Sequence, residues 1–278
     1  MAKMKPVTRI LINGIEGRHI DALDRGLQYG DGLFETLRIR DGRPRHWDEH
    51  MQRLAEGCAR LRLPAVETEP LAAEARLLSQ GVADGVLKIV LTRGDSGRGY
   101  APPVVVRPTR LLALFPPPSY PPAVAREGVA VRVCDTRLGH SPALAGIKHL
   151  NRLEQVLARA EWKDRGTAEG LMLDNEGNVI EGTMSNLFLL RDGRLSTPEL
   201  SRCGVAGVTR ARVMRLAPSL GMAVEQRRIA IDDLAAADEL FLTNSVIGLW
   251  PVRHCAGRDY TPGPLTARLA EALEADDG

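Results

Sequence analysis

A lysine that follows a short run of apolar and small residues is the first group in this sequence whose surroundings favour covalent chemistry. The run is Ala-Leu-Ala-Gly-Ile at 143–147, and Lys148 comes directly after it. Where such a segment is buried, desolvation disfavours the ammonium form and leaves a nucleophilic amine. Most lysines instead end an element with the amine in solvent. This segment alone is therefore compatible with two interpretations of Lys148, a Schiff-base lysine and a surface lysine.

A carboxylate stands among small polar residues further along the chain. Glu181 opens the motif Glu-Gly-Thr-Met-Ser-Asn-Leu-Phe at 181–188, which runs into an apolar strand. In a pyridoxal-phosphate enzyme, a carboxylate in such a place keeps the pyridine nitrogen protonated, so that the cofactor withdraws electrons. A polar surface turn before a strand has the same composition, and it is the competing interpretation.

Three further segments have the residue types of an anion site. Gly-Val-Ala-Gly-Val-Thr-Arg at 204–210 leads into a predicted helix, whose first amides and dipole attract a phosphate. It lacks the Lys-Ser/Thr pair of a Walker loop. Thr243 and Asn244 end a predicted strand with polar side chains. Arg53, one position off the apolar stripe of its helix, could bind a phosphate through two nitrogens. Helix capping, a polar turn and a solvated arginine are the competing interpretations.

The first half of the chain reads as strands and helices that could position these groups. Turn pairs at Asn13-Gly14 and Asp41-Gly42 predict hairpins. Asp48 is predicted to cap a helix that ends at about residue 63, and Thr68 to cap the next helix. The predicted strands are 10–12, 33–40, 43–47, 86–91 and 111–115.

A proline-rich segment divides the chain, because no helix or central strand tolerates its composition. We therefore expect a small N-terminal domain over 1–115, a linker over 116–122 and a larger C-terminal domain over 123–278 that carries the lysine. Mixed strands and helices in both halves predict two α+β domains with a cleft between them. The second half is predicted to contain strands at 129–134, 171–173, 179–180, 187–190, 223–229 and 240–243, and helices at 150–163, 207–216 and 265–273.

Composition excludes several function classes. Lys plus Arg is 37 and Asp plus Glu is 35, so a formal net charge of +2 gives no reason to expect nucleic-acid or membrane-surface binding. No apolar run approaches a membrane span or a signal peptide. The cysteines stand far apart without metal-ligand spacing, so we expect no metal and a reduced, cytoplasmic protein. They are Cys58, Cys134, Cys203 and Cys255.

In this order, the motifs resemble the signature of the class IV aminotransferase family. These fold-type IV pyridoxal-phosphate enzymes include branched-chain and D-amino-acid aminotransferases and aminodeoxychorismate lyases. The resemblance extends over nearly the whole chain, from residues 12–14 and the Gly-Asp-Gly-Leu-Phe-Glu-Thr segment at 30–36 to Thr243 and Asn244. It implies the two-domain, branched-chain-aminotransferase-like α+β fold, with pyridoxal 5'-phosphate between the domains and a homodimer that completes the substrate pocket.

The resemblance also implies roles for individual residues. Lys148 matches the Schiff-base lysine, Glu181 the partner of the pyridine nitrogen, and Arg53 the phosphate-binding arginine. Asn186 is expected to buttress the site. The remaining cofactor-binding positions are Gly207, Val208, Thr209, Thr243 and Asn244.

Three stretches resemble the lyases of the family. They are residues 144–155 around the lysine, the Arg-Gly-Asp-Ser-Gly-Arg-Gly-Tyr loop at 93–100, and Thr36, which matches a threonine that the lyases use as a proton donor. The resemblance implies a folate-pathway lyase for a small dicarboxylate, with Arg98 and Tyr100 recognising a carboxylate and Tyr29 lining the pocket.

Alternatives stay open at this stage. Glu35 departs from the threonine that some lyases carry at this position. A glycine-rich loop such as 93–100 can also be a solvated loop without a binding role. A D-amino-acid or branched-chain aminotransferase, and a catalytically silent binding protein of the same fold, are the other candidates.

Overall fold

The computed structural model describes residues 9–121, 123–164 and 166–276. Parts of the predicted domains and linker (residues 1–8, 122, 165 and 277–278) lie outside the described residues. The chain divides into two compact units, Met1–Ser119 with Ile147–Asn151, and Tyr120–Gly146 with Arg152–Gly278, which we call the first and the second unit. The boundary between Ser119 and Tyr120 falls within the proline-rich segment.

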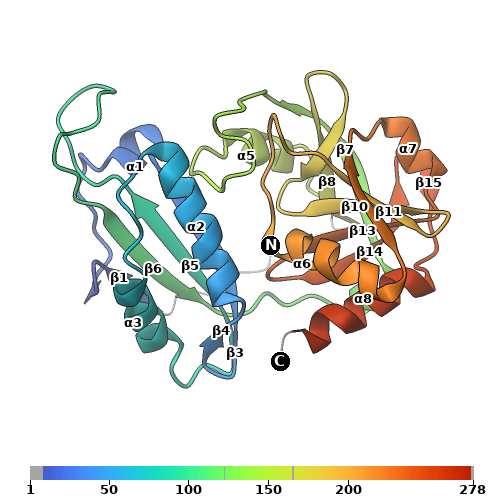
Figure 1. Cartoon of the computed structure of the whole chain (residues 1–278), viewed down its shortest axis with the longest axis horizontal. Helices are drawn as coiled ribbons and strands as arrows, with labels where there is room; N and C mark the ends of the chain where they lie inside the picture. The colour runs from blue at the N-terminus through green and yellow to red at the C-terminus, as the bar shows by residue number, and fades with distance from the viewer. Residues whose placement is uncertain (1–8, 122, 165, 277–278) are drawn as a thin grey trace. The chain divides into compact units, whose positions relative to one another are not determined.

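The first unit is built on a six-stranded antiparallel sheet in the order β2-β1-β6-β5-β3-β4 (Figure 1). The predicted hairpins at residues 13–14 and 41–42 join β1 to β2 and β3 to β4. The strands are β1 (Arg9–Ile12), β2 (Ile15–Glu16), β3 (Gly32–Arg40), β4 (Arg43–Pro44), β5 (Asp84–Thr92) and β6 (Thr109–Phe115).

Helices cover one face of this sheet, since α2 packs on β3 and α3 packs on β6. Alternation along β3 follows from this, because Leu33, Leu37 and Ile39 are buried while Phe34 and Thr36 are only partly buried. The second set lies on the face opposite the helices, which we call the open face. The helices are α1 (Arg25–Tyr29), α2 (Trp47–Leu61) and α3 (Thr68–Ser79).

Two predicted helix caps are wrong. His46 occupies the N-cap position of α2 in a left-handed conformation, so Asp48 lies within the first turn, where its charge favours the helix dipole. Glu67 precedes α3, so Thr68 is the first helical residue. The strand predicted at 43–47 is only two residues long because α2 begins at Trp47.

The lysine segment differs from the predicted domain division. Residues 147–151 belong to the first unit, although the sequence places them in the C-terminal domain. They add an antiparallel bridge to the edge of β3, where the Phe34 amide donates to the Lys148 carbonyl (2.9 Å) and the Leu150 amide donates to the Gly32 carbonyl (3.0 Å). Long-range backbone pairing decides this placement, and sequence position does not reveal it.

The second unit contains a nine-stranded mixed sheet. Its strands follow the order β12-β11-β10-β13-β14-β7-β8-β9, with β15 paired to β14. The pairs β11–β12, β14–β7 and β7–β8 are parallel. The strands are β7 (Val129–Leu138), β8 (Thr167–Asp174), β9 (Val179–Gly182), β10 (Asn186–Arg191), β11 (Arg194–Pro198), β12 (Ala223–Arg227), β13 (Glu239–Asn244), β14 (Gly248–Cys255) and β15 (Arg258–Asp259).

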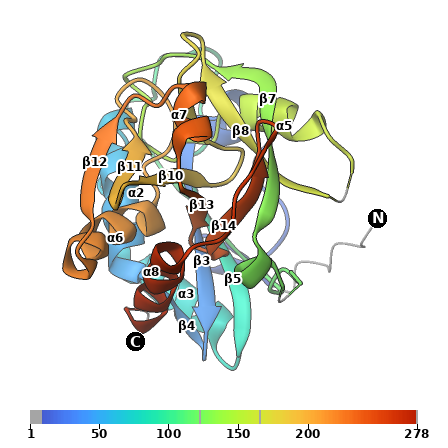
Figure 2. The same ribbon diagram turned by 90° about the vertical axis from the view of Figure 1, so that its right-hand side faces the viewer.

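The helices of the second unit pack against this sheet, and α6 and α8 lie side by side (Figure 2). The helix predicted over 150–163 is shorter, because residues up to 151 pair with β3 instead. No strand was predicted at β14, which contains Pro251, a residue that cannot donate a backbone hydrogen bond to a neighbouring strand. The helices are α4 (Ala123–Glu127), α5 (Leu153–Ala160), α6 (Val208–Leu216), α7 (Ile231–Ala236) and α8 (Pro264–Ala275), with a 3-10 turn at Ala217–Leu220.

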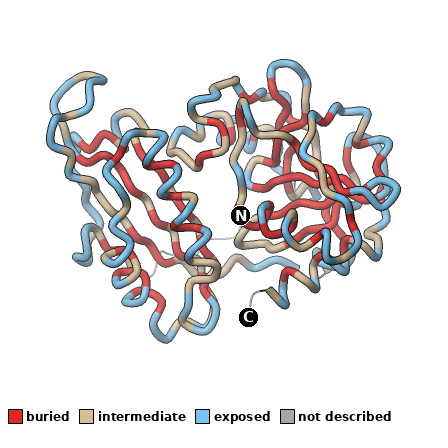
Figure 3. Tube along the Cα trace, viewed as in Figure 1, coloured by how far each residue is buried: buried red, intermediate tan, exposed pale blue. Residues whose placement is uncertain are grey.

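Each unit has its own apolar core, which follows the strands (Figure 3). In the second unit Phe188 and Phe241 stack with ring centroids 5.0 Å apart. These observations confirm the predicted α+β class. The longest helix, α2, has 15 residues, and no helix in the described part of the chain is long and apolar enough to cross a membrane.

Candidate active site

The Lys148 amine lies against an aromatic ring of the first unit. Its Nζ is 4.4 Å from the centre of the Phe34 ring, and the residue is half-buried. The antiparallel pairing of residues 147–151 with β3 fixes this position, because the Lys148 carbonyl accepts a hydrogen bond from the Phe34 amide. The amine is therefore neither fully solvated nor sealed in the core.

A hydroxyl and a second amine share the open face with Phe34. Thr36 follows Phe34 by two residues on β3, and it pairs across the ladder with Lys88 of β5. The Lys88 Nζ is 5.2 Å from the centre of the same Phe34 ring. Burial lowers the pKa of Lys88, and no carboxylate lies within ion-pair distance of it among the described residues. Sequence reasoning missed Lys88, although the alternation along β5 pointed to a polar residue on this face.

Beneath the open face, Arg53 belongs to a buried ionic cluster. The Arg53 guanidinium donates from two nitrogens to the Glu35 carboxylate (2.8 and 2.5 Å), and His50 Nδ1 lies 2.6 Å from the same carboxylate. Burial opposes ionisation of Glu35, but the charge of Arg53 and the hydrogen bond of His50 outweigh it and lower the pKa of Glu35 to about 2. Burial also lowers the pKa of His50, so its ring is neutral. Arg53 is thus oriented by Glu35 rather than solvated on its helix.

In the second unit, Glu181 is held by the main chain. Its carboxylate accepts the Val205 amide (2.8 Å) and a long bond from the Gln155 amide (3.4 Å), and the residue is only 4% exposed. Val205 lies in the segment before α6, which pairs with Gly146 of the segment leading to the lysine. An ionised carboxylate has several lone-pair sites, so a buried one can also accept a hydrogen bond from a protonated ring nitrogen.

Asn186 joins β10 to the start of α6. Its Oδ1 accepts the Gly207 amide (3.1 Å) and its Nδ2 donates to the Val205 carbonyl (2.8 Å). A Cβ on Gly207 would lie 2.1 Å from Asn186 Oδ1, so only glycine fits at this N-cap position. The first amides of α6 are therefore left without a side-chain cap, and Val208 and Thr209 are buried there.

Thr243 lies beside this helix start. It pairs with Asn186 across the β10–β13 ladder, and its buried Oγ1 has no hydrogen-bond partner among the described residues. Asn244 is engaged differently, because its Oδ1 accepts the Val246 and Ile247 amides and its Nδ2 donates to the Met184 carbonyl. The structure gives Asn244 a positioning role, and its predicted contact with the cofactor stays a prediction.

This arrangement fits pyridoxal phosphate. An unpartnered buried hydroxyl beside an uncapped helix start is a donor set for a phosphate. The buried carboxylate of Glu181 is attached to the same segment, 204–207, through the Val205 amide. The second unit therefore gathers Glu181, Asn186, Thr243 and the helix start into one site.

Sequence reasoning also missed Glu169, a carboxylate that shapes the loop between β9 and β10. Glu169 is 1% exposed and accepts the Thr183 and Ser185 hydroxyls (2.5 and 2.8 Å) and the amides of Thr183 and Met184. It fixes the turn between Glu181 and Asn186. No local motif marks it, since the bonds span 14 to 16 residues of sequence.

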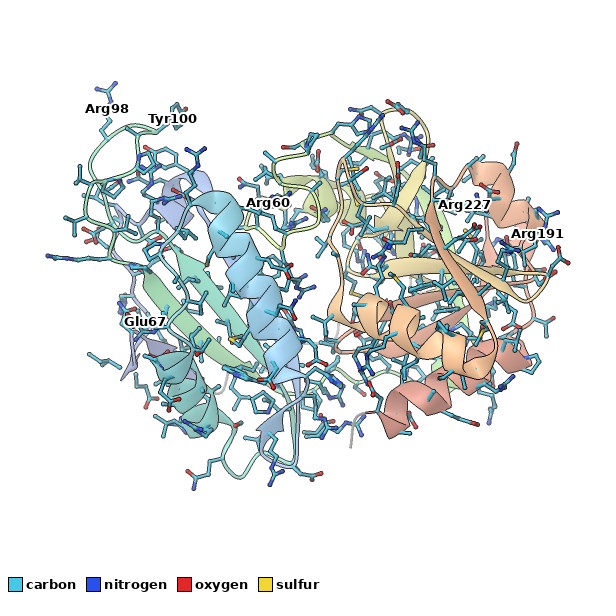
Figure 4. All side chains as sticks on the ribbon, viewed as in Figure 1. Arg60, Glu67, Arg98, Tyr100, Arg191 and Arg227 are labelled. Atoms are coloured by element: carbon cyan, nitrogen blue, oxygen red, sulfur yellow. The ribbon has the colours of Figure 1, made fainter. Side chains whose placement is uncertain are left out.

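The predicted substrate residues lie on and beside the loop after β5. Arg98 and Tyr100 are at its tip and point away from the strands (Figure 4). The Tyr29 ring meets the Tyr100 ring edge-on at 5.4 Å, and the Tyr29 hydroxyl accepts the Gly99 amide (3.3 Å). The structure thus brings Tyr29 and Tyr100 together, while Arg98 extends into solvent in the single chain.

The sequence of this chain matches a known family of enzymes. The model of the amino-transferase class IV family matches residues 32–255. The chain belongs to this family, and it is a pyridoxal-phosphate-dependent enzyme.

Within this family, the chain is similar to both lyases and aminotransferases. The crystal structure of 4-amino-4-deoxychorismate lyase from Pseudomonas aeruginosa superposes with a TM-score of 0.92 at 48% identity, over 96% of this chain and 98% of that one. Aminodeoxychorismate lyase of Vibrio harveyi is 37% identical over 93% of this chain and 97% of its own length. Branched-chain amino acid aminotransferase of Escherichia coli has a TM-score of 0.85 at 27% identity, over 98% and 95%. These neighbours confirm the predicted fold-type IV architecture.

Proposed function

We propose that this chain is a lyase that converts 4-amino-4-deoxychorismate to 4-aminobenzoate and pyruvate, a step of folate biosynthesis. The observation that carries the proposal is the grouping of Lys148 and Thr36 about one aromatic side chain. The lysine amine rests on the Phe34 ring, and Thr36 follows that residue on the same strand face. Chemically, this reaction needs a base for one carbon and a proton donor for another.

Similarity supports the lyase over a transaminase. The two lyases are 48% and 37% identical to this chain, against 27% for the branched-chain aminotransferase of Escherichia coli. All three cover at least 93% of this chain, so the difference is not caused by partial matches.

We propose that Lys148 forms the Schiff base, that Glu181 keeps the ring nitrogen protonated, and that Thr243 with the α6 amides at 208–209 binds the phosphate. Arg53 is proposed as the phosphate arginine, with Glu35 fixing the plane of its guanidinium. When bound, pyridoxal phosphate would supply an electron-withdrawing ring, which would delocalise the electron pair left by proton removal.

The chain's own residues then move two protons. The Lys148 amine removes the proton from the ring carbon that bears nitrogen, a general-base contribution of about 10²–10⁴-fold. Cleavage of the carbon–oxygen bond releases the enolpyruvyl group, and formation of the aromatic ring drives this step. The Thr36 hydroxyl donates a proton to the departing methylene, which becomes the methyl group of pyruvate. Atoms balance without an oxidant or a second substrate.

The two carboxylates of the substrate call for cations. Arg98 with Tyr100 is proposed to bind one, because a guanidinium pairs with a carboxylate through two nitrogens. Lys88 is proposed to attract the other, since it lies on the same face as Thr36 without a carboxylate partner among the described residues. Tyr29 is proposed to line the pocket through its contact with Tyr100.

We further propose that the protein is a homodimer in which the partner covers exposed apolar surface. Leu153 is 76% exposed, and Val156 and Leu157 lie on the same side of α5 at 61% each. On the loop after β5, Tyr100 is 84% exposed and Val104 and Val105 follow it into solvent. Contiguous exposed apolar side chains mark interfaces. A monomer in light scattering at micromolar concentration would refute this assembly.

The cysteines of this chain are free and buried, which supports a cytoplasmic location.

Pyruvate release tests the activity. The protein should release pyruvate from 4-amino-4-deoxychorismate without any keto acid. No release, together with exchange between D-alanine or a branched-chain amino acid and 2-oxoglutarate, would instead establish a transaminase. A Schiff base between lysine and pyridoxal phosphate absorbs visible light, and borohydride abolishes this absorbance. If the protein shows this absorbance but has neither activity, it is a silent binding protein.

A further inference from the structure

A buried guanidinium lies directly beneath the loop that carries Arg98 and Tyr100. Arg25, the first residue of α1, is 3% exposed. Its Nη1 donates to the Gly99 carbonyl (2.9 Å) and to the Ser96 hydroxyl (3.1 Å). Its Nη2 donates to the Tyr100 carbonyl (3.0 Å). With a longer bond from Nη1 to the Ala101 carbonyl (3.4 Å), one side chain therefore binds four positions of residues 96–101, which we call the substrate loop.

A carboxylate and an aromatic ring fix the guanidinium in turn. Arg25 Nε donates to Asp31 (2.8 Å), and the Arg25 guanidinium stacks on the Tyr29 ring at 4.9 Å. Burial opposes ionisation of Asp31, but hydrogen bonds from Arg93 and Arg25 outweigh it and lower the pKa of Asp31. The cation beneath the loop is thus fully paired and has one orientation.

The substrate loop combines an anchored main chain with outward side chains. The carbonyls of Gly99 and Tyr100 point to Arg25, while Arg98 is exposed and the Tyr100 ring is 84% exposed. Glycine-rich loops are ordinarily mobile, and a mobile arginine loses conformational entropy when it binds a carboxylate. Anchoring the main chain beforehand reduces this cost. The loop is therefore preorganised although its tip is in solvent.

We propose that Arg25 is a positioning residue for substrate recognition: it fixes the substrate loop so that Arg98 and Tyr100 are presented to a carboxylate. The relevance to substrate rests on the proposed function, whereas the anchoring of the loop does not. Arg25 itself is too deeply buried to touch substrate, so its effect should fall on substrate affinity and not on the chemical step.

A matched control exists on the other side of Asp31. Arg93 is 5% exposed and also donates to Asp31, from Nε (2.7 Å) and Nη2 (3.1 Å). Its remaining bonds reach the carbonyls of Leu61 and Arg62 and not the substrate loop. Arg25→Lys and Arg93→Lys therefore each weaken an ion pair to the same carboxylate, but only the first removes the loop anchors. Both keep the positive charge beside Asp31.

Amide hydrogen exchange on the cofactor-loaded protein tests the anchoring without activity. The Gly99 amide donates to the Tyr29 hydroxyl and the Ser96 amide to the Leu23 carbonyl, so both report the loop. Arg25→Lys should speed their exchange at least about tenfold, because charge-assisted bonds are lost, and Arg93→Lys less than about twofold. Equal acceleration by the two variants, or none with Arg25→Lys, would overturn the proposal.

Steady-state kinetics test the consequence. Arg25→Lys should raise KM for 4-amino-4-deoxychorismate about tenfold and change kcat less than about twofold, while Arg93→Lys leaves KM within about twofold. A looser loop with unchanged KM would refute the role in recognition. If the enzyme releases no pyruvate at all, the proposed function fails, and the exchange measurement still decides whether Arg25 anchors the loop. Should Arg25→Lys not fold, Ser96→Ala removes one anchor without burying a charge, and it should speed Gly99 exchange about twofold.

Discussion

The two units hold their candidate site residues by different means. In the second unit, Asn186 and Glu181 bond to main-chain groups of the segment before α6. In the first unit, charged side chains hold one another, as Glu35 with Arg53 and Asp31 with Arg25 show. A main-chain cradle fits one anion shape and changes only if the backbone moves, whereas paired side chains can be exchanged one at a time. We infer that the main-chain contacts of the second unit fix the groups proposed to hold the ring and phosphate of the cofactor, and that the paired side chains of the first unit leave more freedom to vary substrate specificity.

The largest expected effect is that of Lys148→Ala, because it removes the group that we propose as both the covalent anchor of the cofactor and the base. Turnover should fall by at least about 10³-fold, since the proposed covalent link and the proposed base would both be lost. After borohydride reduction, mass spectrometry should no longer detect a covalent adduct between the cofactor and the protein. A variant that still forms the adduct would contradict the assignment and with it our division of roles.

The charge-held character of the first unit predicts an acid-sensitive stability. The folded pKa of Glu35 is about 2, against 4.5 ordinarily, so its contribution is complete above pH 4.5 and is lost as the pH falls toward 2. The loss should be roughly 3 kcal/mol. Denaturant unfolding of the wild type and Glu35→Gln across this range measures it. The difference between them should shrink in acid; a constant difference would show that Glu35 is not held ionised.

Thr36→Val separates chemistry from cofactor binding within the open face. Loss of the hydroxyl should lower kcat about 10²-fold, the lower range for a general acid, and leave the visible absorbance intact. Thr36→Ser keeps the hydroxyl and should recover most of the turnover. Normal turnover in the valine variant would remove Thr36 from the mechanism.

Gly207→Ala tests whether the second unit is shaped by the main chain. The new Cβ would lie 2.1 Å from Asn186 Oδ1, so the helix start or Asn186 must shift. Affinity for pyridoxal phosphate should fall about tenfold, equivalent to one or two hydrogen bonds. Gly17→Ala, where the nearest non-neighbouring atom is 4.0 Å away, is the control in cofactor titrations followed by absorbance. Unchanged affinity for Gly207→Ala would mean that the main chain at the start of α6 can shift without loss of cofactor binding.

The smallest effect is expected for Lys88→Met, which removes a cation from the open face but keeps most of its apolar length. KM should rise several-fold to about tenfold with little change in kcat, because a half-buried cation attracts the substrate over a short range. Lys88→Arg should restore part of the affinity. An equal loss in both variants would point to packing rather than charge.

Local pattern determined much of this protein. The turn pairs at 13–14 and 41–42, the strand alternation along β3 and the glycine-rich start of α6 follow from neighbouring residues, and the structure contains each of them. The order of Lys148, Glu181 and the 207–210 segment sufficed to indicate the family, because each motif is continuous in sequence. The helix starts at Asp48 and Thr68 were misplaced by one or two residues, since several polar residues there compete for the cap.

Tertiary structure alone decided how distant residues meet. Residues 147–151 joined the edge of β3, Glu35 rather than solvent paired with Arg53, and Arg25 reached a loop more than 70 residues away. Tertiary contacts also bring Lys88 to the Phe34 ring and Glu169 to the 183–185 turn. Hydrogen bonds and ion pairs of this kind depend on distance in space, and the local periodicity from which a single sequence is read carries no record of it.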